Sequence, residues 1–166
     1  MICALVLVFT TMFCILGSAC VAGASTCSPS TAITIADRAR ALIAQATTAK
    51  AAADSEKAQI LYQHAVEITS ACRGDLDSLV LEGIAATAAA GLWMYEDGHR
   101  AELLLKTARA ALGVACVSDA SAFKKLPLSD QTSFNSALAS YNTLSNRVAS
   151  ASRSYLESCP ATGMIR

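Results

Sequence analysis

The sequence has few glycines, prolines and aromatic residues. Its 166 residues include eight glycines and three prolines, and phenylalanine, tryptophan and tyrosine together make up 5%. Because glycine and proline interrupt helices while alanine, which is abundant here, favours them, the composition predicts long helices and argues against a sheet. The length is typical of one domain with a substantial core.

The sequence also lacks an excess of either charge. Lysine and arginine number 13 together, as do aspartate and glutamate. Surfaces that bind nucleic acid or anionic membranes need basic residues clustered in excess. We therefore expect no nucleic-acid partner, and contact with a membrane only through the N-terminal segment if that segment is retained.

Charged residues are absent from the chain before Asp37. Residues 1–16 form an apolar run, and Ala22 and Ala24 follow it two positions apart, as signal peptidase prefers. We expect residues 1–24 to be a signal peptide that is cleaved after Ala24. The basic residues that usually precede such a run are missing, so an uncleaved membrane anchor is the alternative.

A third interpretation of this segment concerns Cys20. The stretch from Leu16 to Cys20 resembles a bacterial lipobox, although its leucine stands one residue further from the cysteine than that motif has it. Lipid attachment at Cys20 would make the chain a lipid-anchored envelope protein. All three interpretations predict an exported chain, periplasmic or extracellular.

Four cysteines lie beyond the N-terminal segment, spaced 45, 44 and 43 residues apart. They are Cys27, Cys72, Cys116 and Cys159, whereas Cys3, Cys14 and Cys20 lie within the segment. An even number of cysteines in an exported chain predicts two disulfides, and four buried thiols are the alternative. No two of the four have the short spacing of structural zinc ligands, so we expect neither a metal nor a cofactor.

Apolar residues recur every three or four positions through the rest of the chain, which predicts amphipathic helices. We expect a linker over residues 25–30, a helical domain over 31–159 and a flexible tail over 160–166. The helices are expected from near Ser30 or Thr31 to Ala53, from Asp54 or Ser55 to Cys72, from Asp75 to Met94, from His99 to Ala115, and from Ser129 or Asp130 to Cys159. The fold class is therefore all-α, an antiparallel helical bundle or short α-solenoid of about five helices.

Capping and breaking residues set these boundaries. Asp54 and Asp75 are typical N-caps, and Gly74 is expected to end the second helix in a left-handed conformation. The pair Leu126-Pro127 disfavours helix, so the longest loop is expected over residues 116–130.

The third helix is nearly all apolar from Leu79 to Met94, so we expect it to be buried at the centre of the bundle. Gly83, Thr87 and Gly91 are spaced by four, and their small side chains predict the close approach of a neighbouring helix. The apolar run is too short to span a bilayer.

The second and fourth helices repeat a pattern of small, large and small residues. The matched positions are Ala58, Tyr62 and Ala65 in one copy and Ala101, Leu105 and Ala108 in the other. The pattern resembles the second helix of a tetratricopeptide repeat, over residues 42–112, although the copies lie 43 residues apart and not about 34. The resemblance implies stacked helix pairs whose concave face binds a peptide or protein.

Helix direction suggests how the four cysteines pair. In an up-and-down array, the start of the first helix and the end of the second lie at the same end, which pairs Cys27 with Cys72. Cys116 and Cys159 then form the second bridge. The alternative pairs Cys72 with Cys116 and Cys27 with Cys159.

Residues able to carry catalysis are few. His64 and His99 are the only histidines, the carboxylates of Glu82, Glu96 and Asp97 have no evident partner that would tune a pKa, and the common catalytic motifs are absent. We therefore expect the protein not to be an enzyme.

The cluster of Trp93, Met94 and Tyr95 is our candidate interaction site, because tryptophan and tyrosine dominate interface energetics, and core packing is the alternative. We expect an exported, non-enzymatic module for protein interaction or structural assembly, with a protein partner or a second copy. The alternative is a carrier of a small apolar ligand, held between the small-residue face of the third helix and its neighbours. A contiguous cavity of several hundred cubic ångströms would favour the carrier, whereas an exposed groove over a filled core would favour the interaction module.

Overall fold

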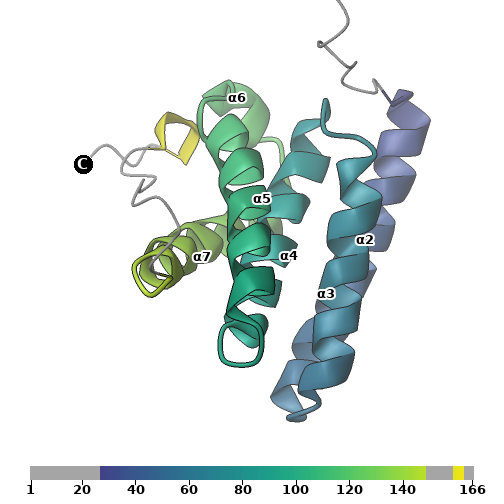
Figure 1. The fold of residues 1–166 in the computed structure, drawn as a ribbon. Coiled ribbons are helices and arrows are strands. Elements are labelled where there is room, and N and C mark those ends of the chain that lie inside the picture. The colour runs from purple at the N-terminus through teal and green to yellow at the C-terminus, as the bar shows by residue number, and fades with distance from the viewer. Residues whose placement is uncertain (1–26, 149–158, 163–166) are drawn as a thin grey trace, which may run out of the picture.

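The computed structural model describes residues 27–148 and 159–162. These residues form the predicted all-α fold, built from antiparallel helical hairpins (Figure 1). The elements are α2 (Pro29–Ala51), α3 (Ser55–Ser70), α4 (Leu76–Trp93), α5 (Gly98–Cys116), α6 (Ala120–Phe123), α7 (Leu128–Ser145) and the short 3-10 helix η1 (Pro160–Thr162). The predictions for residues 1–24, for Cys20 and for the last residues of the tail lie outside the described residues.

Side-chain caps start α2, α3, α4 and α5. Asp54, Asp75 and Asp97 each accept a hydrogen bond from the backbone N–H three residues ahead, as the sequence led us to expect at Asp54 and Asp75. Ser28 caps α2 in the same way, so this helix begins slightly earlier than predicted. Pro29 suits the first turn because its fixed φ is already helical and its missing N–H is not needed there.

α4 lies at the centre of the bundle. It contacts α2, α3, α5 and α7, and every residue from Ser78 to Ala90 except Ala88 is buried. Among the described helices, α4 alone has the length and composition of a membrane-crossing helix, but 61% of it is buried within the protein. This burial agrees with the prediction that the apolar third helix forms the centre of the core.

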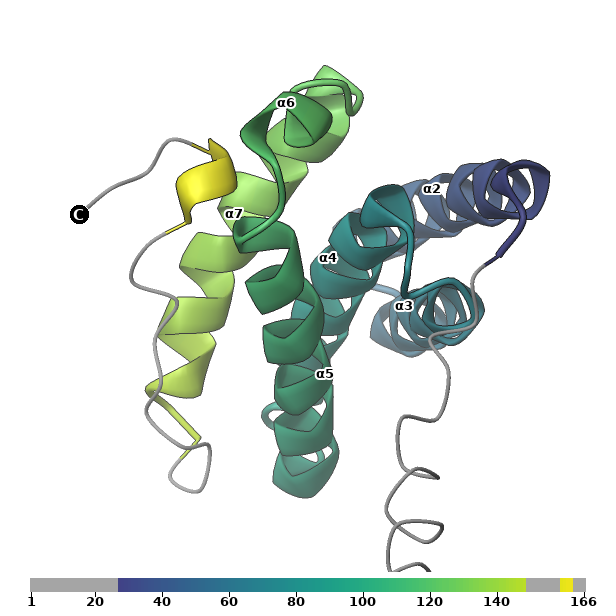
Figure 2. The ribbon, with the colours of Figure 1, turned by 90° about the horizontal axis from the view of Figure 1, so that it is seen from above.

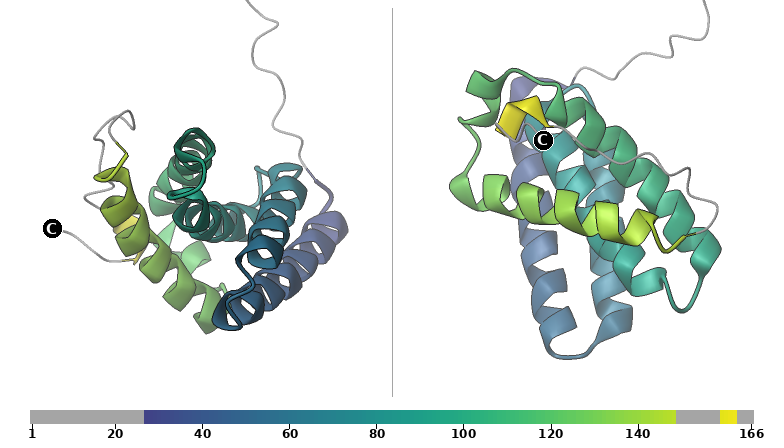
Figure 3. Two further views of the ribbon diagram at one scale, coloured as in Figure 1. Left: turned by 60° about the horizontal axis from the view of Figure 1, so that its bottom comes forward. Right: turned by 90° about the vertical axis from the view of Figure 1, so that its left-hand side faces the viewer.

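The helices form two layers. α3 and α5 lie in front of α2 and α4 in Figure 1, and the view from above separates the layers (Figure 2). α7 extends across both layers and packs against α4 and α5 (Figures 2 and 3). One side of α7 therefore faces α4, while the α2–α3 hairpin stands on the opposite side of α4.

The cysteines lie in the two predicted pairs at disulfide distance. The Cα atoms of Cys27 and Cys72 are 5.4 Å apart, and those of Cys116 and Cys159 are 4.6 Å apart. The first pair joins the start of α2 to the end of α3. The second joins the end of α5 to η1, so the described residues near the C-terminus are held against the bundle.

Gly83 allows the predicted close approach between helices. A Cβ atom at this position would lie 2.5 Å from Cδ2 of Leu112, on α5. A Cβ at Gly91 would lie 3.6 Å from Leu144 on α7, an ordinary contact. The small-residue strip therefore serves close packing at Gly83 and leaves room at Gly91.

Two helix ends differ from the sequence prediction. α3 stops at Ser70 with a right-handed C-cap at Ala71, and Gly74 does not adopt the left-handed conformation expected of it. Among the described residues, Ala53 has the left-handed conformation, with φ of 61°, and it follows the C-cap of α2. Cys72 and Arg73 separate Gly74 from the C-cap at Ala71, so a left-handed cap is not required at Gly74.

The region between α5 and α7 is more ordered than the predicted loop. It contains α6, whose Phe123 is buried and packs edge-on against Phe134 of α7, with ring centroids 5.1 Å apart. Burial of this aromatic side chain stabilises a short helical turn that local propensity did not predict.

The last helix differs from prediction at both ends. It begins at Leu128 after Pro127, and Asp130 is buried in an ion pair where the sequence suggested a cap. It ends at Ser145 with Asn146 as C-cap, well before the predicted end at Cys159. Residues 149–158 of the predicted helix lie outside the described residues.

Candidate functional site

An open groove of about 560 Å³ lies between α7 and the other helices. Its lining comes from four helices that are far apart in the sequence. α2 contributes Ile43, Thr47 and Lys50, α3 contributes Tyr62, α4 contributes Ile84, Thr87, Ala88 and Gly91, and α7 contributes Ser133, Ser136, Ala137, Ala139, Ser140, Thr143 and Leu144. α5 contributes none of the lining residues.

The α7 wall of the groove is rich in hydroxyl groups. Ser133, Ser136, Ser140 and Thr143 recur at helical spacing along it, and all four are exposed. Thr143 donates a hydrogen bond to the carbonyl of Ala139, whereas the three serine hydroxyls make no hydrogen bond within the described part of the chain. Three hydroxyl groups are therefore available to a molecule in the groove.

The opposite wall and the floor are largely apolar. Ile43 and Ile84 meet there beside Ala88. Thr47 donates to the carbonyl of Ile43 at 2.8 Å and lies 3.0 Å from the hydroxyl of Tyr62. Because the Thr47 proton is already used, the Tyr62 hydroxyl is the donor in their contact.

Charge is sparse in the groove. Among the described residues that line it, Lys50 alone is charged, and it is exposed in the last turn of α2. A cation at this end of a helix also interacts favourably with the helix dipole. The groove thus combines an apolar floor, a hydroxyl wall and one positive charge at its rim.

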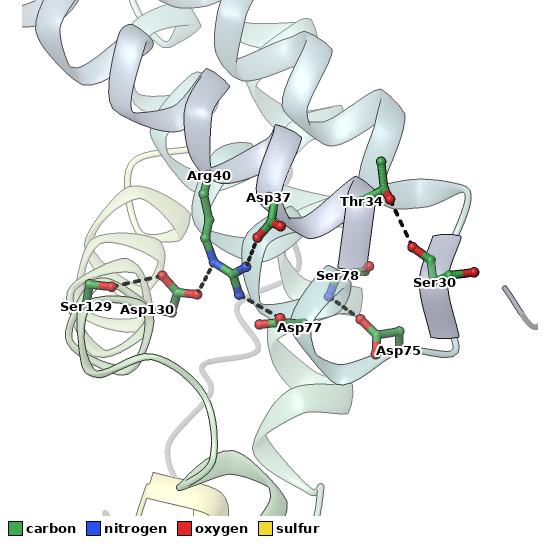
Figure 4. A network of polar contacts seen from close by, with 9 residues as sticks. All are labelled: Ser30, Thr34, Asp37, Arg40, Asp75, Asp77, Ser78, Ser129 and Asp130. Atoms are coloured by element: carbon green, nitrogen blue, oxygen red, sulfur yellow. Dashed lines mark hydrogen bonds and ion pairs between the residues drawn. The ribbon is translucent and has the colours of Figure 1, made fainter. Parts of the chain in front are cut away.

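Arg40 holds the α7 wall in place (Figure 4). From α2, its guanidinium donates to Asp77 of α4 at 2.6 Å and to Asp130 of α7 at 2.8 Å, with a third contact to Asp37 at 3.0 Å. Burial disfavours the charge of Arg40, but the hydrogen bonds and charges of Asp77 and Asp130 outweigh it and raise the pKa of the guanidinium above its usual range. One side chain therefore joins three of the four helices that line the groove.

The predicted interaction residues Trp93, Met94 and Tyr95 lie outside the groove lining. Trp93 is half-buried beneath the guanidinium of Arg100, 4.2 Å from the ring centroid, and its indole N–H is buried without a partner. Met94 is half-buried, and Tyr95 is 82% exposed, with its hydroxyl 3.3 Å from a guanidinium nitrogen of Arg147. Trp93 and Met94 are only partly exposed, and a role of the three residues in binding stays a prediction.

Glu82 has a partner that sequence reasoning did not identify. It is buried within α4, and its carboxylate accepts hydrogen bonds from Arg73, the closest at 2.7 Å. The hydrogen bonds and charge of Glu82 raise the pKa of Arg73. Glu96 likewise accepts from Gln59 at 2.8 Å, and Asp97 is a helix cap. Each of these carboxylates therefore has a structural partner within the fold.

The two histidines lie on different helices. His64 is half-buried on α3, and His99 is exposed in the first turn of α5. Within residues 27–148 and 159–162, no group of three or more histidine, cysteine, aspartate or glutamate side chains is arranged to hold a metal ion.

Sequence reasoning missed the groove and the Arg40 contacts. The hydroxyl row was visible in the sequence, since Ser133, Ser136 and Ser140 alternate with the apolar stripe of the same helix. The Arg40 contacts had no local signal, because Asp77 and Asp130 lie 37 and 90 residues away along the chain.

The fold and the groove define an all-α, disulfide-containing helical bundle with an open binding surface. Comparison with protein-family models, with curated proteins and with solved structures finds no match to this chain. The resemblance to tetratricopeptide repeats therefore stays a prediction.

Proposed function

We propose that this chain is an exported, non-enzymatic interaction module whose groove holds a short extended segment of a partner protein. The observation that carries the proposal is the groove itself, with an apolar floor on α4 and a wall of free serine hydroxyls on α7. An extended peptide presents apolar side chains together with main-chain groups that seek hydrogen bonds. The apolar floor can contact the apolar side chains of a peptide, and the serine hydroxyls can bond its main-chain groups.

The dimensions of the groove fit an extended segment better than a helix. The hydroxyl row from Ser133 to Thr143 spans about 15 Å of α7, which corresponds to four or five residues of extended chain at roughly 3.3 Å each. A helix of the same length and about 10 Å across fills roughly 1,200 Å³. That is about twice the groove volume of about 560 Å³.

The small-ligand carrier is the second candidate, and the volume of the groove favours it, since ligand sites commonly measure ~300–1,000 Å³. However, the exposed residues Ser133, Ser136 and Ser140 form a rim that is open to water. An apolar ligand there would keep much of its surface hydrated and would leave the hydroxyls unused. We therefore favour the peptide.

Two further observations support the proposal. The two disulfides fit an oxidising environment outside the cytoplasm. Apart from α7, the groove is lined mainly by α2 and α4, the first helices of the two hairpins. The tetratricopeptide resemblance implies binding on the concave face of such stacked helix pairs.

Photo-crosslinking in the exporting cell tests this function. A photoreactive residue replaces Ser140, which lines the groove, or Asn135, which is exposed on α7 outside it. We expect adducts from position 140 that map to one segment of one partner, and none from position 135. A synthetic peptide of that segment should bind the unmodified protein and lose at least tenfold in affinity for Ala88→Phe, which fills the floor.

Other outcomes would contradict the proposal. Equal crosslinking from both positions would show contacts unrelated to the groove. A small molecule that copurifies with the protein, detected by native mass spectrometry and displaced by Ala88→Phe, would establish the carrier instead.

A further inference from the structure

The single charge of the groove has no partner in the groove lining. Within the part of the chain that the structure describes, the Lys50 ammonium forms no ion pair, whereas Arg40, Arg73 and Lys106 pair with carboxylates at 2.6, 2.7 and 2.8 Å. No aspartate or glutamate is among the described lining residues. The dipole of α2 favours a cation at this helix end but leaves the three N–H donors of the ammonium unused.

The acids that are near Lys50 in the sequence lie outside the groove. Asp37, the one acid of α2, is 13 residues away, about 20 Å along the helix. Asp54 caps α3 by accepting a hydrogen bond from the backbone N–H of Lys57 at 3.1 Å. Glu56 is in the first turn of α3 and does not line the groove. A carboxylate that meets Lys50 inside the groove therefore has to come from a bound molecule.

Lys50 lies at one end of the groove. α2 and α4 run in the same direction (Figure 1), and Lys50 is in the last turn of α2. α7 finishes near the same end, because Leu144 lies against Gly91 in the last turns of α4. At the opposite end, Asp130 of α7 accepts a hydrogen bond from Arg40. A carboxylate bound by Lys50 would therefore fix the position of a segment along the groove.

The apolar floor lies a short distance from this charge. Ile43 and Lys50 are seven residues apart on α2, about 10 Å along the helix. Ile43 lines the groove together with Ile84 and Ala88. An extended chain covers about 10 Å in three residues. A segment that contacts both features would carry its acidic group about three positions from its main apolar side chain.

We propose that the segment bound in the groove carries a carboxylate that pairs with Lys50. The inference rests on the proposed function and adds the chemical class of the partner: a short apolar stretch with an acidic side chain, or a C-terminal carboxylate, about three positions away. Lys50 discriminates against basic segments because like charges repel across an interface. The serine hydroxyls both donate and accept, so they do not distinguish acidic from basic segments.

Selection from random peptides tests the proposal. Short peptides are displayed with the C-terminus either joined to the carrier or free, and are selected on the exported, disulfide-bonded protein for binding that Ala88→Phe abolishes. We expect aspartate or glutamate at a constant position in both formats. A terminal carboxylate as the bound group would instead enrich peptides in the free format alone. Both results support a carboxylate on Lys50.

Variants at Lys50 assign this preference to one side chain. Lys50→Glu should select lysine or arginine at the position where the wild type selects an acid, and the apolar positions should stay the same. Lys57→Glu changes an exposed lysine outside the groove and should keep the preference for acids. Because Lys50 is exposed, circular dichroism should show unaltered folding for both variants.

Affinity measurements with one selected peptide give the size of the effect. Replacing its carboxylate by the amide should weaken binding to the wild type about fivefold, as for an exposed ion pair. The same replacement should leave the affinity for Lys50→Met unchanged, since no cation remains for the carboxylate to contact. The difference for the wild type should decrease as salt increases.

The outcomes separate this inference from the proposed function. Selected peptides without a preference for a carboxylate would overturn the inference and leave peptide binding in the groove intact. So would a preference that Lys50→Glu does not change. If no peptide distinguishes the wild type from Ala88→Phe, the proposed function fails, and the inference fails with it.

Discussion

Ala53 holds the left-handed conformation that ends α2. The N–H of Asp54 donates to the carbonyl of Ala49 at 2.9 Å, and the N–H of Ala53 donates to that of Lys50 at 3.0 Å. This is the Schellman arrangement, in which glycine usually occupies the left-handed position. An alanine there is strained because its Cβ crowds the backbone.

We predict that Ala53→Gly stabilises the protein. The residue is exposed, so no packing is lost, and relief of the left-handed strain outweighs the greater backbone entropy of glycine when unfolded. The gain should be about 0.5–1 kcal/mol in the free energy of unfolding, measured by denaturant titration. Ala44→Gly, at an exposed position inside α2, is the control and should cost about 1 kcal/mol. A loss of stability in Ala53→Gly would contradict the assigned conformation.

Among the secondary-structure elements, α4 and α5 approach each other closely at Gly83. We predict that Gly83→Ala destabilises the protein by about 1–2 kcal/mol, since the overlap of the new methyl with Leu112 exceeds the gain in helix propensity. Gly91→Ala, on the same helix, meets nothing closer than 3.6 Å and should gain up to about 1 kcal/mol. Thermal unfolding of the two variants checks this, and equal effects would refute the close approach.

The position of α7 depends on Arg40. Arg40→Met removes the guanidinium and leaves Asp77 and Asp130 facing each other without a cation. We predict a loss of about 2 kcal/mol in the free energy of unfolding and faster amide hydrogen exchange in α7. Arg38→Met, an exposed position on the same helix, should change neither. Unchanged exchange in α7 of Arg40→Met would show that other contacts position this wall of the groove.

Helices are predictable from the sequence where their start and burial depend on residues that are close in the chain. Asp54, Asp75 and Asp97 start their helices through bonds to residues three positions away, and the apolar run of α4 is buried as its composition requires. The short α6 and the start of α7 were not predictable in this way. They depend on Phe123 meeting Phe134 and on Asp130 meeting Arg40, contacts that form only once distant helices have packed.

At the scale of the whole molecule, both disulfides lie at the end of the bundle where α3 and α5 finish (Figure 1). Cys27 and Cys72 are 45 residues apart and Cys116 and Cys159 are 43 apart, so each bridge restricts the unfolded chain by about 4 kcal/mol before any strain. We predict that replacing either pair by alanine lowers the free energy of unfolding by about 2–4 kcal/mol. Peptide mapping without reductant should find the same two linkages in the exported wild-type protein. A Cys72–Cys116 linkage would contradict the fold.

The pairing of cysteines was predictable at this scale, because helix direction alone brings Cys27 to Cys72. The groove was not, since its walls come from α2 and α7, which are joined through Arg40 across 90 residues of sequence. The serine row on α7 can be seen in the sequence, but only the packing of α4 beside it makes it one wall of a groove.

Photo-crosslinking from position 140 in the exporting cells tests this account most directly. We predict that position 140, in the groove, links to one segment of a different protein, whereas position 135, on α7 outside the groove, gives no adduct. Adducts from position 140 that contain only this chain, or that are absent, would contradict the central claim that the groove binds a partner.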